Sequence, residues 1–426
     1  MSLDKAFCSS PWIHMKIASS GNMTYCRWSN QQADQFKIQD TDPATFFQSH
    51  MSGVRQNLLN AQLPAGCVEC TVMEQYNKVS GRQRQLLKTG ITIEHFNKSL
   101  VSSPFVSEFK KSVDCDGHTD LMPVDWQIDL GNHCNSACVF CFPTSSSRLA
   151  TEFVKLGLIS QMPPRSWVED PAALEKFLST LNATPNLSYL HFIGGETLIT
   201  PGFKKILQAL VQHGLAQKIT IGFTTNLTVW DEEINQLLCE FSQIQLGLSI
   251  ESMTRVNDYV RWPSKIDSVT EILHRWIELS RQQNWITTIR TTPTALTAGE
   301  LLDVYKFALA HEIGIESCNF LHKPEMLRMS VLPADVRQPI IDQLRAWIQQ
   351  QQGSTTQIIN TRNPDQLAHS LLQDAVSYVD YLENAPDQSD QLPKLVNYLK
   401  LLESSRGNKI LDYLPEYEQL FRSAGY

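Results

Sequence analysis

Residues 126–141, WQIDLGNHCNSACVFC, join an alternating run of apolar and polar residues to three cysteines. Apolar and polar residues alternate over residues 126–130, and a period of two predicts a β-strand. Three cysteines then follow at once, Cys134, Cys138 and Cys141. A strand that runs into closely spaced thiols predicts a metal-binding loop at the carboxyl end of that strand.

The same rhythm continues downstream of this stretch, where short apolar runs alternate with helical patterns. Six strands are expected, each followed by a helix; the strands are 126–130, 189–193, 219–224, 244–250, 285–291 and 317–321, and the helices 171–183, 203–211, 234–241, 266–279, 301–309 and 340–348. Repeated βα units imply right-handed crossovers and a parallel sheet, either open and doubly wound or closed into a barrel. Polar residues follow the strands, where parallel barrels carry their active sites: Asn132, Glu196, Asn226, Glu251, Thr292 and His322.

The composition narrows the class of protein. The 426 residues include 36 Lys and Arg against 44 Asp and Glu, a net charge of −8 that argues against a general nucleic-acid or membrane-surface binder. Hydrophobic residues make up 42% and charged residues 19%, which are globular values. We find neither an apolar run of about 18 residues nor the apolar core of a secretory signal. The sequence therefore predicts a cytoplasmic protein without a membrane partner.

In a reducing compartment, a cysteine-rich chain is expected to bind metal or to do redox chemistry rather than to form disulfides. The ten cysteines fall into two groups and three isolated thiols. The first group lies in the first seventy residues, and the second is the triplet of residues 134–141; the isolated thiols are Cys115, Cys239 and Cys318. This distribution predicts two metal centres. Cys239 and Cys318 are expected in the core.

Three thiolates spaced by three and two residues suit a [4Fe–4S] cluster, and they leave one iron without a protein ligand. An open iron is a place for a substrate or cofactor. The alternative is zinc, but zinc ligands usually come as paired short-spaced residues. The triplet therefore favours an open iron–sulfur site.

The chain resembles the radical S-adenosylmethionine (SAM) superfamily over about residues 126–324. The resemblance rests on the Cys-x₃-Cys-x₂-Cys triplet with an aromatic residue before its last cysteine, and on motifs after three further strands; these residues are Phe140, Gly194-Gly195-Glu196, Thr224-Thr225-Asn226, Ser249-Ile250-Glu251 and Arg261. One departure is Thr197, where the family often has proline. The resemblance implies an α/β fold with a partial (β/α)6, TIM-like barrel.

The resemblance also implies a cofactor site and a chemistry. The open iron would chelate SAM, and one electron from a flavodoxin- or ferredoxin-type reductant would release a 5′-deoxyadenosyl radical. The cofactor-binding residues would be Phe140 on the adenine, Gly194 and Gly195 for close approach, Glu196 on the SAM ammonium, Asn226 and Ser249 on ribose or carboxylate, Arg261 on the carboxylate, and Thr225 and Glu251 beside them. Taken alone, Gly194-Gly195 is a turn and Arg261 an ion-pair residue; His191 is expected to be a hydrogen-bonded core histidine.

A second set of metal ligands is predicted near the N-terminus, at Cys8, Cys26, Cys67 and Cys70. Four thiolates complete a closed site for zinc or for a second [4Fe–4S] cluster. The segment resembles the SPASM/twitch auxiliary-cluster modules of radical SAM enzymes, through Cys8-x-x-Pro11-Trp12, a Gly21 turn and Cys26, although those modules usually follow the barrel. The resemblance favours an auxiliary [4Fe–4S] cluster over zinc.

Cys115 lies between Asp114 and Asp116, whose negative charges disfavour a nucleophilic thiolate. A surface thiol is the expected role, and a catalytic or labile cluster-ligand role the weaker alternative. The expected domains are a Cys-rich auxiliary module at 1–75, a bridge at 76–122, a radical SAM barrel at 123–350 and a helical region at 355–426.

Three functions remain open at this stage. The favoured one is hydrogen abstraction from a C–H bond of a peptide or protein substrate, giving oxidation, cross-linking or epimerisation. The second is the same chemistry on a small polar metabolite, such as a sugar or nucleotide. The third, from a different class, is a non-catalytic iron–sulfur or zinc protein for electron transfer or interaction.

Overall fold

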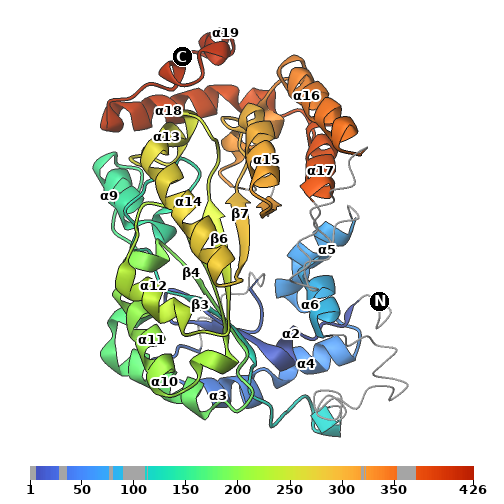
Figure 1. Ribbon diagram of the computed structural model, residues 1–426. Coiled ribbons are helices and arrows are strands. Elements are labelled where there is room, and N and C mark those ends of the chain that lie inside the picture. The colour runs from blue at the N-terminus through green and yellow to red at the C-terminus, as the bar shows by residue number, and fades with distance from the viewer. Residues whose placement is uncertain are drawn as a thin grey trace. The chain divides into compact units, whose positions relative to one another are not determined.

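The structure is a computed structural model that describes residues 6–27, 36–75, 80–89, 111–112, 114–317, 321, 323–352 and 371–426. The chain divides into two compact units. The first unit comprises Met1–Asn132, Pro164–Phe223 and Glu232–Ile244, and the second comprises His133–Pro163, Thr224–Asp231 and Gln245–Tyr426. Figure 1 shows their helices and strands.

Both units are mixed α/β, and their strands are mostly parallel. The strands are β1 (His14–Ile17), β2 (Met23–Thr24), β3 (Asp125–Asp129), β4 (Tyr189–Ile193), β5 (Thr220–Thr225), β6 (Gln243–Ser249), β7 (Ile286–Thr291) and β8 (Gly314–Ser317). The order is β2-β1-β3-β4-β5 in the first unit, where only the β1/β2 pair is antiparallel, and β6-β7-β8 in the second. The predicted α/β class is confirmed, whereas barrel closure stays a prediction.

Helices follow the strands as the rhythm predicts. Those that accompany the strands β3 to β8 are α9 (Ser147–Lys155), α10 (Pro171–Ala183), α11 (Pro201–Gln212), α12 (Glu232–Cys239), α13 (Val256–Val260), α14 (Ile266–Gln282), α15 (Leu301–Ala310) and α16 (Ala334–Gln352). Helix α10 has the predicted bounds because Asp170 accepts hydrogen bonds from the backbone N–H groups of Ala172 and Ala173, and Pro171 fixes the first turn.

The N-terminal segment contributes short helices and an addition to the sheet. Its helices are α2 (Ser10–Ile13), α3 (Pro43–Thr45), α4 (Ser52–Leu59), α5 (Val68–Gln75) and α6 (Gly81–Thr89). Strand β1 pairs in parallel with β3, from His14 opposite Asp125 to Ile17 opposite Ile128. The sequence did not predict this strand. A buried hydrogen bond of 3.0 Å between His14 Nδ1 and Asp125 Oδ1 ties the two strands together.

Aromatic side chains form much of the core of the first unit. Trp126 on β3 packs edge-on against Phe177 of α10, with ring centroids 5.9 Å apart, and Trp167 packs against the same ring at 5.2 Å. All three rings are buried. Strand β3, which precedes the cysteine triplet, is therefore fixed by close packing against these aromatic rings.

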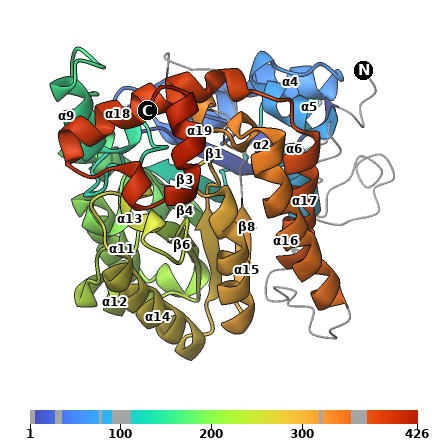
Figure 2. The ribbon, with the colours of Figure 1, turned by 90° about the horizontal axis from the view of Figure 1, so that it is seen from above.

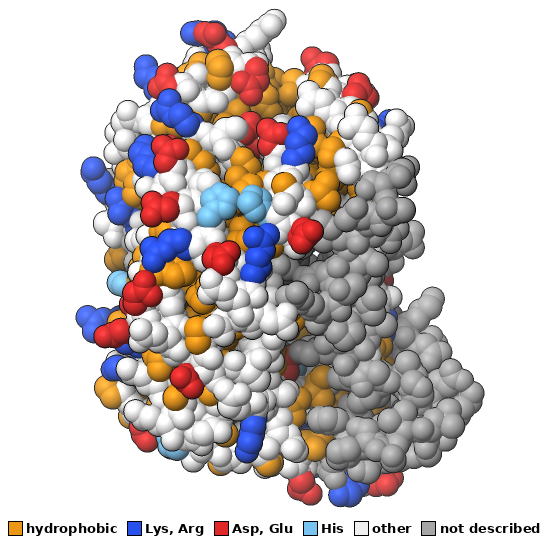
Figure 3. Space-filling model, viewed as in Figure 1, with side chains coloured by type: hydrophobic (Ala, Val, Ile, Leu, Met, Phe, Trp, Pro, Cys, Tyr) orange, Lys and Arg blue, Asp and Glu red, His pale blue; other side chains and the backbone are white. Residues whose placement is uncertain are grey.

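The predicted C-terminal helices are α17 (Leu371–Asn384), α18 (Leu392–Arg406) and α19 (Glu418–Ser423). Helix α17 packs beside α16, as the two ribbon views show (Figures 1 and 2). None of the helices in the described ranges is long and apolar enough to cross a bilayer. Acidic and basic side chains are interspersed over the face drawn in Figure 3.

Some predictions fall outside the described residues: Cys318, His322, the linker after residue 352 and most of the strand predicted at 317–321. The part of that region that is described forms β8, Gly314–Ser317, which begins three residues before the predicted strand. His191 is a core histidine as predicted, buried and 3.0 Å from the Tyr189 hydroxyl. Cys239 is half-buried rather than in the core, because it lies at the last residue of α12.

Candidate active site and four-cysteine pocket

The cysteine triplet lies on an irregular loop of the second unit, between residues 133 and 142. The loop is paired through its backbone to the segment that carries Arg261. Ala137 N donates to Trp262 O at 2.7 Å, and Val139 N donates to Val260 O at 2.8 Å. These two bonds fix the loop on either side of Cys138, so that its thiol has a defined position without regular secondary structure.

Asn226, one of the predicted cofactor residues, contacts this loop directly. Its Nδ2 atom lies 2.9 Å from Asn135 Oδ1, 3.1 Å from Ser136 Oγ and 3.9 Å from Cys134 Sγ. Its Oδ1 atom accepts from the backbone N–H of Thr228 at 3.1 Å. The Asn226 side chain therefore orients the first cysteine of the triplet.

The start of helix α9 holds the other side of the loop. The Ser146 hydroxyl donates to Ser136 O at 2.5 Å and accepts from Leu149 N at 3.1 Å, which caps the helix. The Ser147 hydroxyl lies 3.2 Å from Cys134 N. Ser146 thus links the start of α9 to the cysteine loop.

Arg261 and Glu251 form a buried ion pair beside the triplet. The Arg261 Nε and Nη2 atoms donate to Glu251 Oε1 at 3.1 and 2.5 Å. The second carboxylate oxygen of Glu251 accepts from Thr291 Oγ1 at 2.9 Å and from Thr292 N at 2.6 Å. Both oxygens of the Glu251 carboxylate therefore accept hydrogen bonds within the protein. This geometry favours a role in positioning Arg261 over direct contact with a cofactor.

The electrostatics of the loop show that its thiols and Arg261 lie close together. The pKa of Cys141 is raised to about 12, mainly by burial and also by the nearby Cys138 and Cys134, while Arg261 acts in the opposite direction. Burial also raises the pKa of Cys138, against the effect of Arg261. In the absence of metal these thiols are protonated, and a bound metal would replace their protons.

The donor set of this loop fits a [4Fe–4S] cluster. Three thiols come from one segment of eight residues, and a buried guanidinium stands beside them to balance thiolate charge. The Phe140 ring is half-buried, with the Arg261 guanidinium 5.6 Å from its centroid. Ser249 and Thr225 are buried at the ends of β6 and β5.

The Gly194-Gly195-Glu196 motif belongs to the first unit. Gly194 has a positive φ of 95°, and a Cβ there would overlap Asp129 Oδ1 and Gly131 O, so only glycine fits. Glu196 is buried, and its Oε1 atom accepts from Leu198 N at 3.2 Å, which caps a short 3-10 helix at Thr197–Ile199. Thr197, at the family's proline position, begins this helix without disrupting it.

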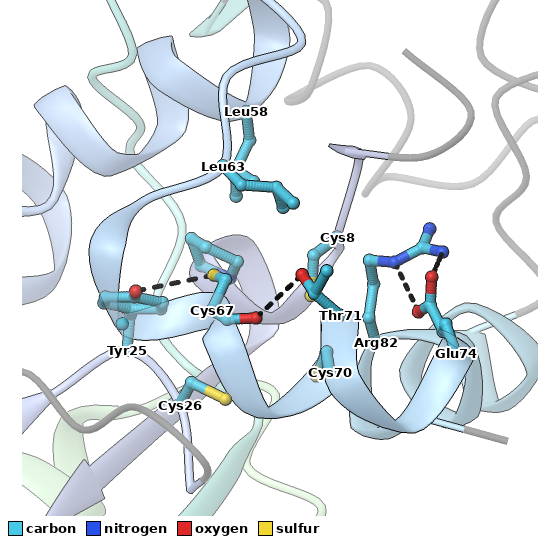
Figure 4. Close-up of a pocket in the computed structure, with 12 residues that line it drawn as sticks. Cys8, Tyr25, Cys26, Leu58, Leu63, Cys67, Cys70, Thr71, Glu74 and Arg82 are labelled. Carbon is cyan, nitrogen blue, oxygen red and sulfur yellow. Dashed lines mark hydrogen bonds and ion pairs between the residues drawn. The ribbon is translucent and has the colours of Figure 1, made fainter. Parts of the chain in front are cut away.

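The four N-terminal cysteines line one pocket of the first unit, although they come from three separate segments (Figure 4). Cys8 precedes α2, and Cys26 follows β2. Cys67 ends the 3-10 turn Ala65–Cys67 that leads into α5, and Cys70 lies in the first turn of α5. Leu58 and Leu63 cover one side of the pocket, and Glu74 and Arg82 line it as well. The sequence grouped these cysteines, and the fold brings them together.

The thiols of this pocket influence one another. Burial raises the pKa of Cys8, and the charges of Cys26 and Cys67 raise it further. Burial likewise raises the pKa of Cys67, whereas the Tyr25 hydroxyl, 3.7 Å from its sulfur, and Arg82 lower it. A donor set of four thiols suits either a second [4Fe–4S] cluster or zinc.

Within the described residues, no three Cys, His, Asp or Glu side chains are already drawn together around one metal-ion position. A single zinc ion would need its sulfurs at about 2.3 Å. Cys115 is exposed, in line with a surface thiol.

Two residues of α18 contact the triplet loop and its surroundings, and sequence reasoning missed both. The Tyr398 hydroxyl donates to Val139 O at 2.8 Å. Arg406 forms a buried ion pair with Glu152 of α9 at 2.7 Å, and its guanidinium lies 5.2 Å from the Trp262 ring. The loop and α18 are more than 250 residues apart in sequence, so no local pattern could reveal these contacts.

Comparison with known proteins finds a family model that matches part of this chain. Residues 128–308 match the family model of the Radical SAM superfamily. The sporulation killing factor maturation protein SkfB of Bacillus subtilis (strain 168) is 22% identical over 180 residues, which cover 41% of this chain and 39% of SkfB. The chain thus matches about two fifths of the length of that relative.

Comparison with solved structures gives only low similarity scores. Streptococcus suis SuiB bound to S-adenosylmethionine has a TM-score of 0.38 and 14% identity, covering 70% of this chain and 64% of SuiB. anSMEcpe with bound AdoMet has the same TM-score and 18% identity, covering 53% of this chain and 60% of anSMEcpe. At these TM-scores the structures carry no argument, and the assignment rests on the sequence match. Residues 128–308 are therefore similar to the radical SAM superfamily domain.

Proposed function

We propose that this protein is a radical SAM enzyme that abstracts hydrogen from a C–H bond of its substrate. One observation carries the proposal: the thiols of Cys134, Cys138 and Cys141 lie on one loop beside the buried Arg261, within the residues that match the radical SAM family model. When bound, the cluster and SAM supply a one-electron cleavage of the sulfonium C–S bond, which yields methionine and a 5′-deoxyadenosyl radical. A flavodoxin- or ferredoxin-type protein would supply the electron.

The residues of the second unit would prepare the site for this chemistry. The three cysteines would hold the cluster, and Asn226 would orient Cys134 through its amide. Arg261, fixed by Glu251, would balance thiolate charge and present the edge of its guanidinium toward the SAM carboxylate. Phe140 would supply an apolar face for the adenine ring.

In the first unit, Glu196 would accept hydrogen bonds from the SAM ammonium through its carboxylate. Gly194 and Gly195 would let the backbone approach the methionine moiety. In the second unit, Ser249 and Thr225 would form hydrogen bonds with the ribose through their hydroxyls.

We further propose that the four-cysteine pocket holds an auxiliary [4Fe–4S] cluster. The support is the donor set itself: four thiols from three segments line one pocket whose wall also contains a buried arginine. Such a centre would accept an electron from the substrate radical and make the net reaction an oxidation. Zinc is the alternative occupant, and iron analysis separates the two.

The substrate we favour is a peptide or protein. The support is the SkfB match, since that relative is named as the maturation protein of a killing factor. A small polar metabolite is the alternative. Mass spectrometry of candidate peptides and of a metabolite pool after anaerobic turnover would show which class loses hydrogen.

The primary test is the formation of 5′-deoxyadenosine. The anaerobically reconstituted chain, given SAM and a strong reductant, should produce 5′-deoxyadenosine and methionine in equal amounts. Cys138→Ala should abolish both products, while Cys239→Ala, a half-buried thiol of α12 outside both cysteine groups, should not. Equal SAM cleavage by the two variants would refute the proposal.

A further inference from the structure

The four-cysteine pocket contains a second polar feature, a close ion pair between Arg82 and Glu74 (Figure 4). Arg82 Nε donates to Glu74 Oε1 at 3.0 Å, and Arg82 Nη2 donates to Glu74 Oε2 at 2.7 Å. Both side chains line the pocket, and the arginine is buried with 7% of its surface exposed. A two-pronged pair of this kind holds the guanidinium in one orientation.

The pair is also connected to the segments that carry the cysteines. Glu74 lies on α5 one helical turn after Cys70, while the third nitrogen of Arg82, Nη1, donates to the backbone oxygen of Phe7 at 3.1 Å. Phe7 immediately precedes Cys8. Arg82 therefore links the helix with Cys67 and Cys70 to the loop with Cys8.

A buried cation is costly unless a negative charge compensates it. One carboxylate balances Arg82 in the structure, and four thiolates in the same pocket would place far more negative charge beside it. Arg82 lines the same pocket as all four thiols. The guanidinium thus lies within electrostatic range of the proposed cluster.

We propose that Arg82 is a positioning residue of the four-cysteine centre, and that the Arg82–Glu74 pair sets the reduction potential of the cluster bound there. The inference rests on the proposed auxiliary cluster. Reduction adds one negative charge to an iron–sulfur cluster, so a neighbouring cation stabilises the reduced form and a neighbouring anion destabilises it. The two members of the pair must therefore act in opposite directions.

The test isolates this centre in the full-length chain. A background variant with Cys134, Cys138 and Cys141 changed to alanine removes the other cluster, and anaerobic reconstitution then loads the N-terminal centre alone. Iron and sulfide analysis measures loading, and a redox titration followed by electron paramagnetic resonance measures the potential.

In that background, Arg82→Gln should shift the potential to a more negative value, because it removes the cation and leaves Glu74 uncompensated. Glu74→Gln should shift it to a more positive value, because it removes the negative charge that lies beside Arg82. Arg82→Lys should keep the potential near that of the parent, and the double variant should fall between the single ones. Arg84→Gln, two residues along α6 and not among the pocket-lining residues, should leave it unchanged.

Opposite shifts would support the inference, since loss of structure alone moves both variants in the same direction. If Arg82→Gln fails to fold, Glu74→Gln and Arg82→Lys still decide the question. Loaded clusters whose potential is the same in all variants would overturn the inference and leave the auxiliary cluster intact. A background chain that binds zinc, or about zero iron, would overturn the auxiliary cluster itself and this inference with it.

Discussion

Arg261 donates two hydrogen bonds to one carboxylate oxygen of Glu251, and both side chains are buried in the second unit. The other oxygen is held by Thr291 and by the backbone of Thr292 at the end of β7. The sequence left open whether Arg261 was a cofactor residue or an ion-pair residue. The geometry shows the ion pair, and it places that pair next to the cysteine loop.

Removing the Glu251 carboxylate should lower the stability of the folded chain. Glu251→Ala leaves Arg261 as a buried cation without its counterion, so we expect the free energy of unfolding to fall by about 3–5 kcal/mol. Urea denaturation measures this. The control is Glu418→Ala, which breaks the exposed pair with Arg422 and should cost about 0.5 kcal/mol or less. Equal losses in the two variants would contradict the structural role of Glu251.

Tyr398→Phe tests the contact between α18 and the triplet loop. The variant keeps the ring but removes the donor to Val139 O, and we expect a loss of about 1 kcal/mol in stability. We also expect faster loss of iron from the triplet on dilution into chelator. Tyr413→Phe, in the same C-terminal region, is the control. The contact is unimportant if both variants release iron at the wild-type rate.

Gly194→Ala tests the close approach at the glycine motif. A Cβ at this positive φ would overlap Asp129 Oδ1 and Gly131 O, so we expect a loss of about 3 kcal/mol or more and weaker SAM binding. Gly53→Ala, within α4 and with open space around it, should instead be neutral or stabilise by up to about 1 kcal/mol. Thermal unfolding and equilibrium dialysis with SAM would show the difference, and wild-type values for Gly194→Ala would contradict the geometry.

The raised pKa of the buried Asp129 predicts that the stability of the folded chain depends on pH. Burial raises its pKa to about 6, although Gly131 N and Lys16 act in the opposite direction. The folded chain therefore binds this proton more tightly than the unfolded chain, and stability is lost as pH rises from about 4 to about 6. Asp129→Asn should remove this loss. The free energy of unfolding of the variant, relative to that of wild type, should therefore rise by about 2 kcal/mol between pH 4 and pH 7. A difference that does not change with pH would contradict the assignment.

Local patterns predicted much of the fold. Helix α10 and strand β4 have the predicted bounds because a proline start, an Asp170 cap and an apolar run are all encoded within a few residues. Strand β1 was missed because its four residues, His14–Ile17, alternate too briefly to give a signal. Its place beside β3 depends on tertiary contacts such as His14 with Asp125.

The same limit applies to the candidate sites. Short spacing was enough to group the triplet, whereas the N-terminal cysteines were grouped because all four lie within the first seventy residues. It did not reveal that Asn226 contacts Cys134, that Tyr398 contacts Val139 or that Arg82 enters the four-cysteine pocket. These contacts join residues that lie between 12 and 259 positions apart, and they depend on packing rather than on motif.

We propose that the chain carries two iron–sulfur centres, of which the triplet alone cleaves SAM. The most direct measurement is iron content and 5′-deoxyadenosine formation for two variants, one with Cys134, Cys138 and Cys141 changed to alanine and one with Cys67 and Cys70 changed. We expect about eight irons in the wild type and about four in each variant. SAM cleavage should persist only in the variant that keeps the triplet. Zinc in place of iron, or SAM cleavage that survives loss of the triplet, would contradict the account.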